Sequence, residues 1–119
     1  MKIEKFEDLA VWNEALELAK EIYLELKVSR DYSFRDQLQR SAVSISSNIA
    51  EGFERQTNKE FIQFLYIAKG SCGELRTQVH LAMRVGILNQ EKSVEMLEKT
   101  KKISSMLYGL IKVRKEKFG

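Results

Sequence analysis

Apolar residues recur along this chain at alternating steps of three and four, the spacing that places side chains on one face of an α-helix. Residues 7–28 and residues 34–54 each carry such a stripe, and each stripe predicts one amphipathic helix. The first comprises Leu9, Trp12, Leu16, Ala19, Tyr23 and Leu26, and the second comprises Phe34, Leu38, Ala42, Ile45, Ile49 and Phe53.

The second half of the chain repeats the pattern, with predicted helices over residues 58–86 and 90–117. No alternation typical of a β-strand extends beyond a few residues. The third stripe comprises Phe61, Leu65, Ala68, Cys72, Leu75, Val79 and Ala82, and the fourth comprises Leu97, Thr100, Ile103, Ser104, Leu107, Leu110 and Ile111.

The breaks between stripes carry residues that begin and end helices. Ser33 is expected to cap the second helix, Asn58 or Thr57 the third, and Asn89 the fourth, while Gly86 suits the end of the third. The connections are short, so neighbouring helices should be antiparallel. The sequence therefore predicts an all-α, up-down-up-down antiparallel four-helix bundle.

Composition supports one folded unit, residues 1–119. The chain is 44% hydrophobic and 31% charged, which argues against disorder, and the absence of proline favours long helices. With a single cysteine it forms no internal disulfide. The first residues contain no apolar run of signal-peptide length, and no window is long enough to span a membrane. We expect a cytoplasmic protein.

Small and polar residues form a second row on the predicted second helix, and two glycines, Gly70 and Gly73, interrupt the third. A mid-helix glycine costs about 1 kcal/mol relative to alanine, so we expect close approach of helix backbones to offset it. The row comprises Gln37, Ser41, Ser44, Asn48 and Gly52.

The polar row has two possible surroundings: the interior of its own bundle or a neighbouring subunit. We expect Ser44 and Asn48 to pack within the chain, with Glu74 or Glu51 as hydrogen-bond partners of the Asn48 amide, since an unpaired buried amide costs about 1–3 kcal/mol. Arg40, Glu51 and Arg55 are expected to be exposed.

The residues that could support catalysis are poorly placed for it. Cys72 and Ser71 are candidate nucleophiles, but His80 lies eight residues after Cys72, about 12 Å along a helix. Glu74 and His80 do not have the spacing of a carboxylate–histidine metal site, and no phosphate-binding glycine loop is present. We therefore expect no enzyme activity, no metal and no cofactor.

Charge is unevenly distributed along the chain. Residues 1–28 carry four basic and seven acidic side chains, whereas residues 90–119 carry eight basic and four acidic. Cations in the last helix could bind phosphate groups, or could form a solvated face suited to the negative end of the helix dipole. Glu95 and Lys99 are spaced to pair within the helix. The candidate nucleic-acid contacts are Lys99, Lys101, Lys102, Lys112, Arg114, Lys115 and Lys117.

Three segments of the chain resemble the bacterial 23S rRNA intervening-sequence proteins. They are FEDLAVW from Phe6, DQLQRSAVSISSNIAEGF from Asp36, and KEFIQFLYIAKGSCGEL from Lys59. The joint before the second helix lacks the Phe-Pro pair common in the family. The residues that carry the family pattern, or that the resemblance places at an interface, are Gln37, Arg40, Ser44, Asn48, Glu51, Gly52, Ser71 and Glu74.

The resemblance implies a four-helix bundle that assembles as a homopentamer. Family members are encoded within sequences that interrupt ribosomal RNA genes and also as separate genes, and a distant bundle relative serves retroelements by binding nucleic acid. Two functions follow. The chain could bind RNA or DNA, structured ribosomal RNA in particular, through a basic surface. Alternatively, it could be a protein-binding scaffold within a ring-shaped homo-oligomer. No small-molecule substrate and no membrane is expected in either case.

Overall fold

Four long helices make up the structure, a computed structural model that describes residues 2–118 and their side chains as far as Lys117. After a short 3-10 turn, η1 (Phe6–Asp8), the chain forms the four helices α1 (Ala10–Glu25), α2 (Tyr32–Phe53), α3 (Asn58–Arg84) and α4 (Gln90–Phe118). The predicted unit 1–119 includes Met1 and Gly119, which lie outside the described residues.

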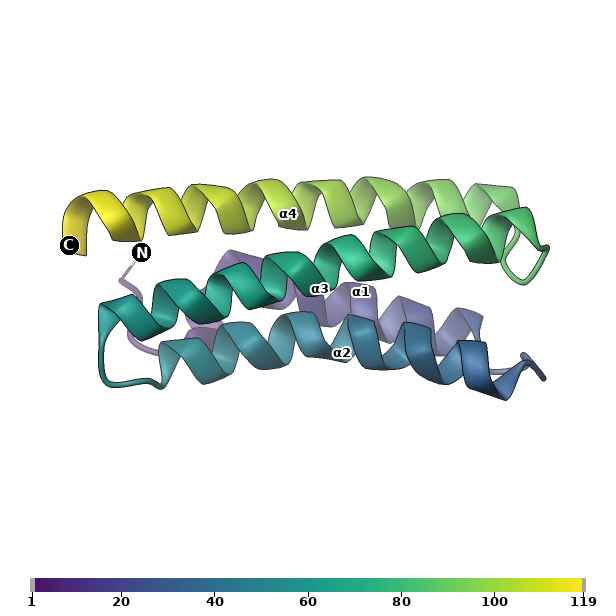
Figure 1. Ribbon diagram of the computed structural model, residues 1–119, viewed down its shortest axis with the longest axis horizontal. Coiled ribbons are helices and arrows are strands. Elements are labelled where there is room, and N and C mark those ends of the chain that lie inside the picture. Colours follow the sequence, from purple (N-terminus) through teal and green to yellow (C-terminus); the bar gives the residue numbers. More distant parts are fainter. Residues whose placement is uncertain (1, 119) are drawn as a thin grey trace.

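Successive helices run in opposite directions, as the colour gradient in Figure 1 shows. Each helix packs on the next in sequence, and α1 packs on α4 to close the bundle. The molecule is a rod of 45 × 23 × 20 Å. The predicted four-helix bundle is confirmed, and the part of the chain that the structure describes contains no strand.

The first helix is shorter than the predicted 7–28. Phe6–Asp8 form a 3-10 turn and Leu9 is extended, so α1 begins only at Ala10. The Asp8 carboxylate holds the turn by accepting hydrogen bonds from the backbone N–H groups of Glu4 and Lys5, at 3.0 and 3.2 Å. These hydrogen bonds stabilise its charged form and lower the pKa of Asp8. The other helix ends lie within two residues of the predicted positions.

One predicted cap is wrong and the others are confirmed. Asp31, not Ser33, caps α2, because its Oδ1 accepts a hydrogen bond from the Phe34 N–H at 3.2 Å. Thr57 is the one of its pair that caps α3, and Asn89 Oδ1 accepts from the Lys92 N–H at 2.8 Å. Gly86 follows α3 with φ of +80°, a left-handed conformation that glycine adopts readily.

The residues that α2 and α3 contribute to the core agree largely with the prediction, whereas those of α1 differ from it in part. All seven residues of the third stripe are buried. In α1, the stripe residues Leu9, Ala19 and Leu26 are buried, and so are Ala15 and Ile22, which were expected to widen the stripe. Leu16 and Tyr23 of the stripe are instead 45% and 47% exposed, and the buried face is completed by Val11 and Leu18, which were not predicted. Helix α1 therefore has two apolar faces, and only one of them packs in the interior.

Close helix packing occurs at Gly52 and not at the two predicted glycines. A Cβ atom on Gly52 would lie 2.5 Å from the Cβ of Phe64 and 3.1 Å from a ring carbon of Phe61, so α2 and α3 approach closely there only because residue 52 lacks a side chain. A Cβ on Gly70 or Gly73 would meet nothing within 4 Å. The expectation of close packing at Gly70 and Gly73 is therefore wrong.

Candidate nucleic-acid interface

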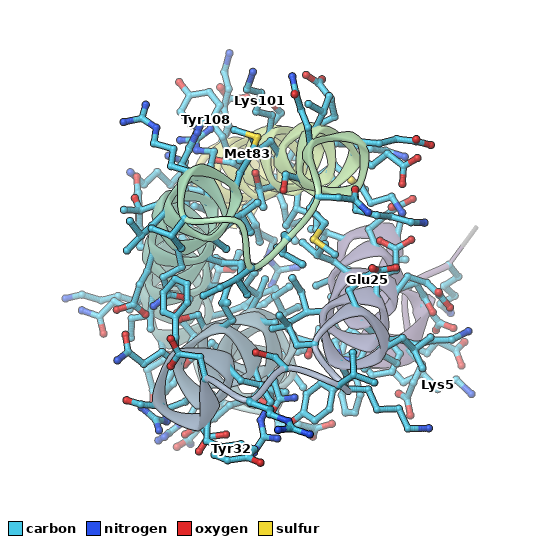
Figure 2. The ribbon with its side chains drawn as sticks, turned by 90° about the vertical axis from the view of Figure 1, so that its right-hand side faces the viewer. Lys5, Glu25, Tyr32, Met83, Lys101 and Tyr108 are labelled. Carbon is cyan, nitrogen blue, oxygen red and sulfur yellow. The ribbon has the colours of Figure 1, made fainter. Side chains whose placement is uncertain are left out.

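Charged side chains join the outer edges of α1 and α4. Lys102 Nζ lies 3.0 Å from Glu14 Oε1, and Lys92 Nζ lies 3.8 Å from Glu25 Oε1. Lys99 pairs with Glu21 between them. Figure 2 places Glu25 on α1 beside α4. These ion pairs join the acidic first segment of the sequence to its basic last segment, since α1 and α4 lie against each other in antiparallel orientation.

Three of the seven candidate phosphate contacts are consequently paired with carboxylates. Lys99 and Lys102 bind α1, and Lys101 Nζ lies 3.8 Å from Glu98 Oε1 in its own helix. The predicted pair of Glu95 with Lys99 is wrong, because the Glu95 carboxylate lies 3.6 Å from Lys92. The i,i+4 spacing within α4 did not determine the partner of Lys99, because Glu21 of α1 lies closer to it across the seam.

The last turns of α4 hold the remaining four candidates. The Arg114 Nε–H donates to Asn58 Oδ1 at 2.7 Å, and its guanidinium lies over the Phe61 ring. Lys115 Nζ donates to the Tyr66 hydroxyl at 2.8 Å. Lys112 and Lys117 are exposed, and neither contacts a side-chain partner among the described residues. Arg114 thus fixes α4 to the start of α3, while Lys112 and Lys117 remain open to a ligand.

A basic surface that the sequence did not predict follows the seam between α3 and α4. We call it the α3–α4 face. Its members recur at steps of three, four or seven on each helix, so that they point to the same side. Figure 2 shows Lys101 and Tyr108 on this side of the bundle and Tyr32 on the opposite one. The face comprises Tyr66, Lys69, Arg76, Lys101, Tyr108, Lys112 and Lys115.

Few carboxylates oppose these cations. On α3, Glu74 accepts a hydrogen bond from Ser41 of α2 at 2.9 Å, and Glu60 contacts Thr57 and Arg55 beside the α2–α3 joint. Of the five cations, only Lys101 has a carboxylate partner among the described residues. The unbalanced charges produce a positive potential over this side of the bundle.

Lys69 and Arg76 belong to this candidate interface and were not predicted from the sequence. Both are half-buried, so their aliphatic stems pack on the bundle while their charged groups reach the surface. The available signal was spacing: residues 66, 69, 73, 76 and 80 form one helical row in which no residue is acidic. Basic residues are densest in the last quarter of the chain, and the predicted contacts all lie there.

The polar row of α2 forms hydrogen bonds within the chain. Ser44 Oγ lies 2.9 Å from Ser71 Oγ of α3, and the Asn48 amide donates to the backbone oxygen and the Oγ of Ser44, at 2.7 and 2.9 Å. The expected intrachain packing of Ser44 and Asn48 is confirmed. The expected partners of Asn48, Glu74 and Glu51, are wrong, because Ser44 lies one turn earlier on the same helix and is closer.

The charged family-pattern residues of α2 are exposed, as predicted. Arg40 reaches solvent, and Glu51 Oε2 lies 2.8 Å from the guanidinium of Arg55, which is exposed too. The uncharged Gln37, for which no exposure was predicted, is also exposed. Arg40 also lines a hollow of about 480 Å³ beside Tyr23. The family pattern therefore combines a packing set, including Gly52, Ser44 and Ser71, with a solvent-facing set.

An apolar groove lies between α1 and α2, along the second apolar face of α1. It encloses about 280 Å³. It is lined by small and aliphatic residues of α2 and by aromatic and aliphatic residues of η1 and α1. The lining residues are Phe6, Trp12, Leu16, Ala19, Val43, Ser46, Ser47 and Ala50.

The candidate catalytic residues are not brought together. Cys72 is buried, its Sγ–H donates to the Thr100 backbone oxygen at 3.1 Å, and burial raises the pKa of the thiol despite the nearby Arg76 and Lys69. His80 is exposed on the same helix. Among residues 2–118, no three potential ligands are clustered to hold a metal ion, and no helix is apolar over a length sufficient to cross a bilayer.

Comparison with known proteins identifies the family. Residues 7–109 match the model of the 23S rRNA-intervening sequence protein family, so the chain belongs to that family. A protein of unknown function from the S23 ribosomal protein family of Bacteroides thetaiotaomicron has a similar structure, with a TM-score of 0.81 and 27% sequence identity over 87% of this chain and 99% of that one. No curated protein matches the sequence.

Proposed function

We propose that this member of the 23S rRNA-intervening sequence protein family is a non-enzymatic cytoplasmic module that binds structured RNA, ribosomal RNA in particular, through its α3–α4 face. The observation that carries the proposal is the separation of the chain's basic residues into two sets. One set is neutralised by carboxylates of α1. The other lies along α3 and α4, where only Lys101 has a carboxylate partner among the described residues.

The α3–α4 face has the chemistry that phosphate binding requires. Lys69, Arg76 and Lys112 have no carboxylate partner among the described residues, so binding a phosphate would not break an ion pair. Cations along two adjacent helices can follow a nucleic-acid backbone, and each neutralised phosphate releases counterions. Recognition would then depend on phosphate spacing and RNA shape more than on base sequence.

The proposal is tested by measuring affinity for an RNA hairpin as a function of salt. Fluorescence anisotropy of a labelled hairpin should give a log affinity that falls linearly with log salt, with a slope of about −3 to −5 if four to six phosphates are contacted. A DNA duplex of matched length shows whether the RNA helix is preferred. Absence of binding even at low salt would overturn the proposal.

A second function, a homo-oligomeric protein scaffold, is favoured by the apolar groove between α1 and α2. Leu16 and Val43 expose apolar surface there, at 45% and 39%, and neighbouring exposed apolar residues are a feature of protein–protein contact sites. The occupant we propose is a second copy of this chain. Helix α3 can supply the opposing surface, because Ile67 and Leu81 are half exposed and Gly70 leaves room for close approach.

Such a contact joins two different surfaces of the same chain, and repeated contacts of this kind form a ring when the rotation between copies closes and an open filament when it does not. The family resemblance suggests five copies. The α3–α4 face occupies a neighbouring side of α3 and would be repeated around the ring, so the two functions are compatible.

Analytical ultracentrifugation of the Leu16→Glu variant tests the assembly. This change places a charge in the groove and is expected to give monomers. Leu24→Glu is the matched control, because Leu24 is more exposed, at 60%, lies on the same helix and is outside the groove. A wild-type chain that sediments as a monomer would contradict the scaffold.

A further inference from the structure

Two exposed tyrosines lie among the cations of the α3–α4 face. Tyr66 is 46% exposed and Tyr108 is 59% exposed, and each directly follows a fully buried leucine of the core. Neither ring is needed to fill the interior, which is closed by Leu65 and Leu107 next to them. Their position therefore calls for an explanation other than packing.

The two rings lie at almost the same level of the bundle. Because α3 and α4 are antiparallel, residues that lie at the same level have numbers with a constant sum. Cys72 contacts Thr100 and Asn58 contacts Arg114, and these two pairs have the same sum. The same sum places residue 106 opposite Tyr66, so Tyr108 is displaced from Tyr66 by only two residues, or about 3 Å along the helix axis. Both helices present their tyrosine on the α3–α4 side, so the rings flank one short stretch of the seam.

Cations surround this pair of rings. Lys115 Nζ lies 5.0 Å from the centre of the Tyr66 ring, and its ammonium donates to the Tyr66 hydroxyl. Lys112 is one turn after Tyr108, and Lys69 is one turn after Tyr66. A nucleic-acid strand whose phosphates met these lysines would bring its bases within reach of the rings.

We propose that the α3–α4 face selects unpaired nucleotides, with bases stacked on Tyr108 and Tyr66 and the flanking phosphates bound by Lys69, Lys112 and Lys115. The inference rests on the proposed function and specifies its ligand as a single-stranded segment, such as a loop of a folded RNA. An aromatic ring can stack on any exposed base, whereas bases in a duplex are already stacked on one another. A surface of lysines alone would bind the phosphates of single strands and of duplexes, and would not distinguish between them.

The test compares a labelled single-stranded RNA of about 12 nucleotides with a blunt duplex of the same sequence, a length within the usual footprint of single-strand binders. The wild-type chain should bind the single strand more tightly. Tyr108→Ala should weaken single-strand binding about tenfold, leave duplex binding unchanged and keep the salt slope, because no cation is removed. Tyr108→Phe should retain the wild-type affinity, since the ring is kept.

Tyr32→Ala is the matched control. Tyr32 is also 59% exposed, but it lies at the start of α2 on the opposite side of the bundle, as Figure 2 shows. Removal of the Tyr32 ring should change neither the affinity for the single strand nor the affinity for the duplex. Circular dichroism of each variant verifies that the bundle is intact.

Two results overturn the inference while leaving the proposed function in place: equal affinity for single strand and duplex, or an equal loss of both on Tyr108→Ala. A lack of binding to any nucleic acid overturns the proposed function and the preference together. Base stacking also quenches tyrosine fluorescence, so titration of the single strand provides an independent readout that Tyr108→Ala should reduce.

Discussion

Lys102 Nζ lies 3.0 Å from Glu14 Oε1 across the α1–α4 seam, whereas Lys101, the preceding residue, points to the other side of α4 and pairs only with Glu98 of its own helix. The two side chains are equally exposed, at 59%. Adjacent lysines thus have different roles. Lys102 helps to set the pairing of two helices, and Lys101 contributes to a surface that a ligand can reach.

Exchanging the charges of Glu14 and Lys102 tests the first role. Glu14→Lys and Lys102→Glu should each lower the free energy of unfolding, because each places like charges together across the seam. The double variant should recover part of the loss, with a coupling of about 0.5 kcal/mol, since both groups are partly exposed. Urea denaturation at low salt measures this coupling, and molar salt should reduce it. Strict additivity of the two changes would show that the ion pair does not contribute.

Adding a methyl group at two glycines should have opposite effects. Gly52→Ala places a Cβ 2.5 Å from Phe64 Cβ, so we expect the free energy of unfolding to fall by about 1–3 kcal/mol. Gly70→Ala meets no atom within 4 Å and should raise it by up to about 1 kcal/mol, because alanine favours the helix. Thermal or urea denaturation of both variants measures the difference. A Gly52→Ala protein as stable as wild type would contradict the close approach of α2 and α3.

Gly70→Ala also bears on the proposed assembly. If α3 docks in the groove of a second copy through this glycine, the monomer should gain stability while the oligomer weakens. Sedimentation of the same variant separates the two effects.

The buried thiol of Cys72 makes stability depend on pH at the alkaline end. Burial raises the pKa of Cys72 above its ordinary value of 9.0. Above about pH 9 the unfolded chain therefore loses the thiol proton while the folded chain retains it. The resulting stabilisation is complete below that pH and declines as pH rises toward the folded pKa, by at most about 1.4 kcal/mol per pH unit.

Comparing the wild-type chain with Cys72→Ala isolates this effect, because lysine and tyrosine titrations are common to both. The difference in unfolding free energy between the two proteins should narrow as pH rises from about 8 to 10. A thiol reagent should also modify Cys72 slowly in the folded protein and at once in urea. Rapid labelling under native conditions would show that the thiol is accessible.

The predictability of the fold varied with the number of apolar faces on each helix. In α3, periodicity identified every buried residue correctly. In α2 it identified the buried Leu38, Ala42, Ile45 and Ile49, while Phe34 and Phe53 at the ends of the stripe are only partly buried. Helix α1 has two apolar faces. The predicted stripe correctly included the buried Leu9, Ala19 and Leu26, but it also included Leu16 and Tyr23, which lie on the outer face. Periodicity alone does not show which of two stripes faces the interior, because that depends on where α2 and α4 pack.

The candidate site was harder to predict than the fold, because charge pairing across helices is a tertiary property. The sequence showed that residues 90–119 are basic but not that Lys99 and Lys102 would meet Glu21 and Glu14. It likewise gave no reason to group Lys69 with Lys112, which are distant in sequence. The polar row of α2 was recognised, whereas its partner, Ser71, became clear only from the packing of α3 on α2.

The central claim is that cations of the α3–α4 face, and not those of the α1–α4 seam, bind RNA. Two double variants test it most directly: Lys69→Gln with Lys112→Gln, and Lys99→Gln with Lys102→Gln. Both remove two positive charges, so non-specific attraction changes equally. The first should lower the magnitude of the salt slope for the hairpin by roughly 1.5 and weaken binding, while the second should leave the slope at its wild-type value. Equal slopes for the two variants, or a loss confined to Lys99 and Lys102, would contradict the account.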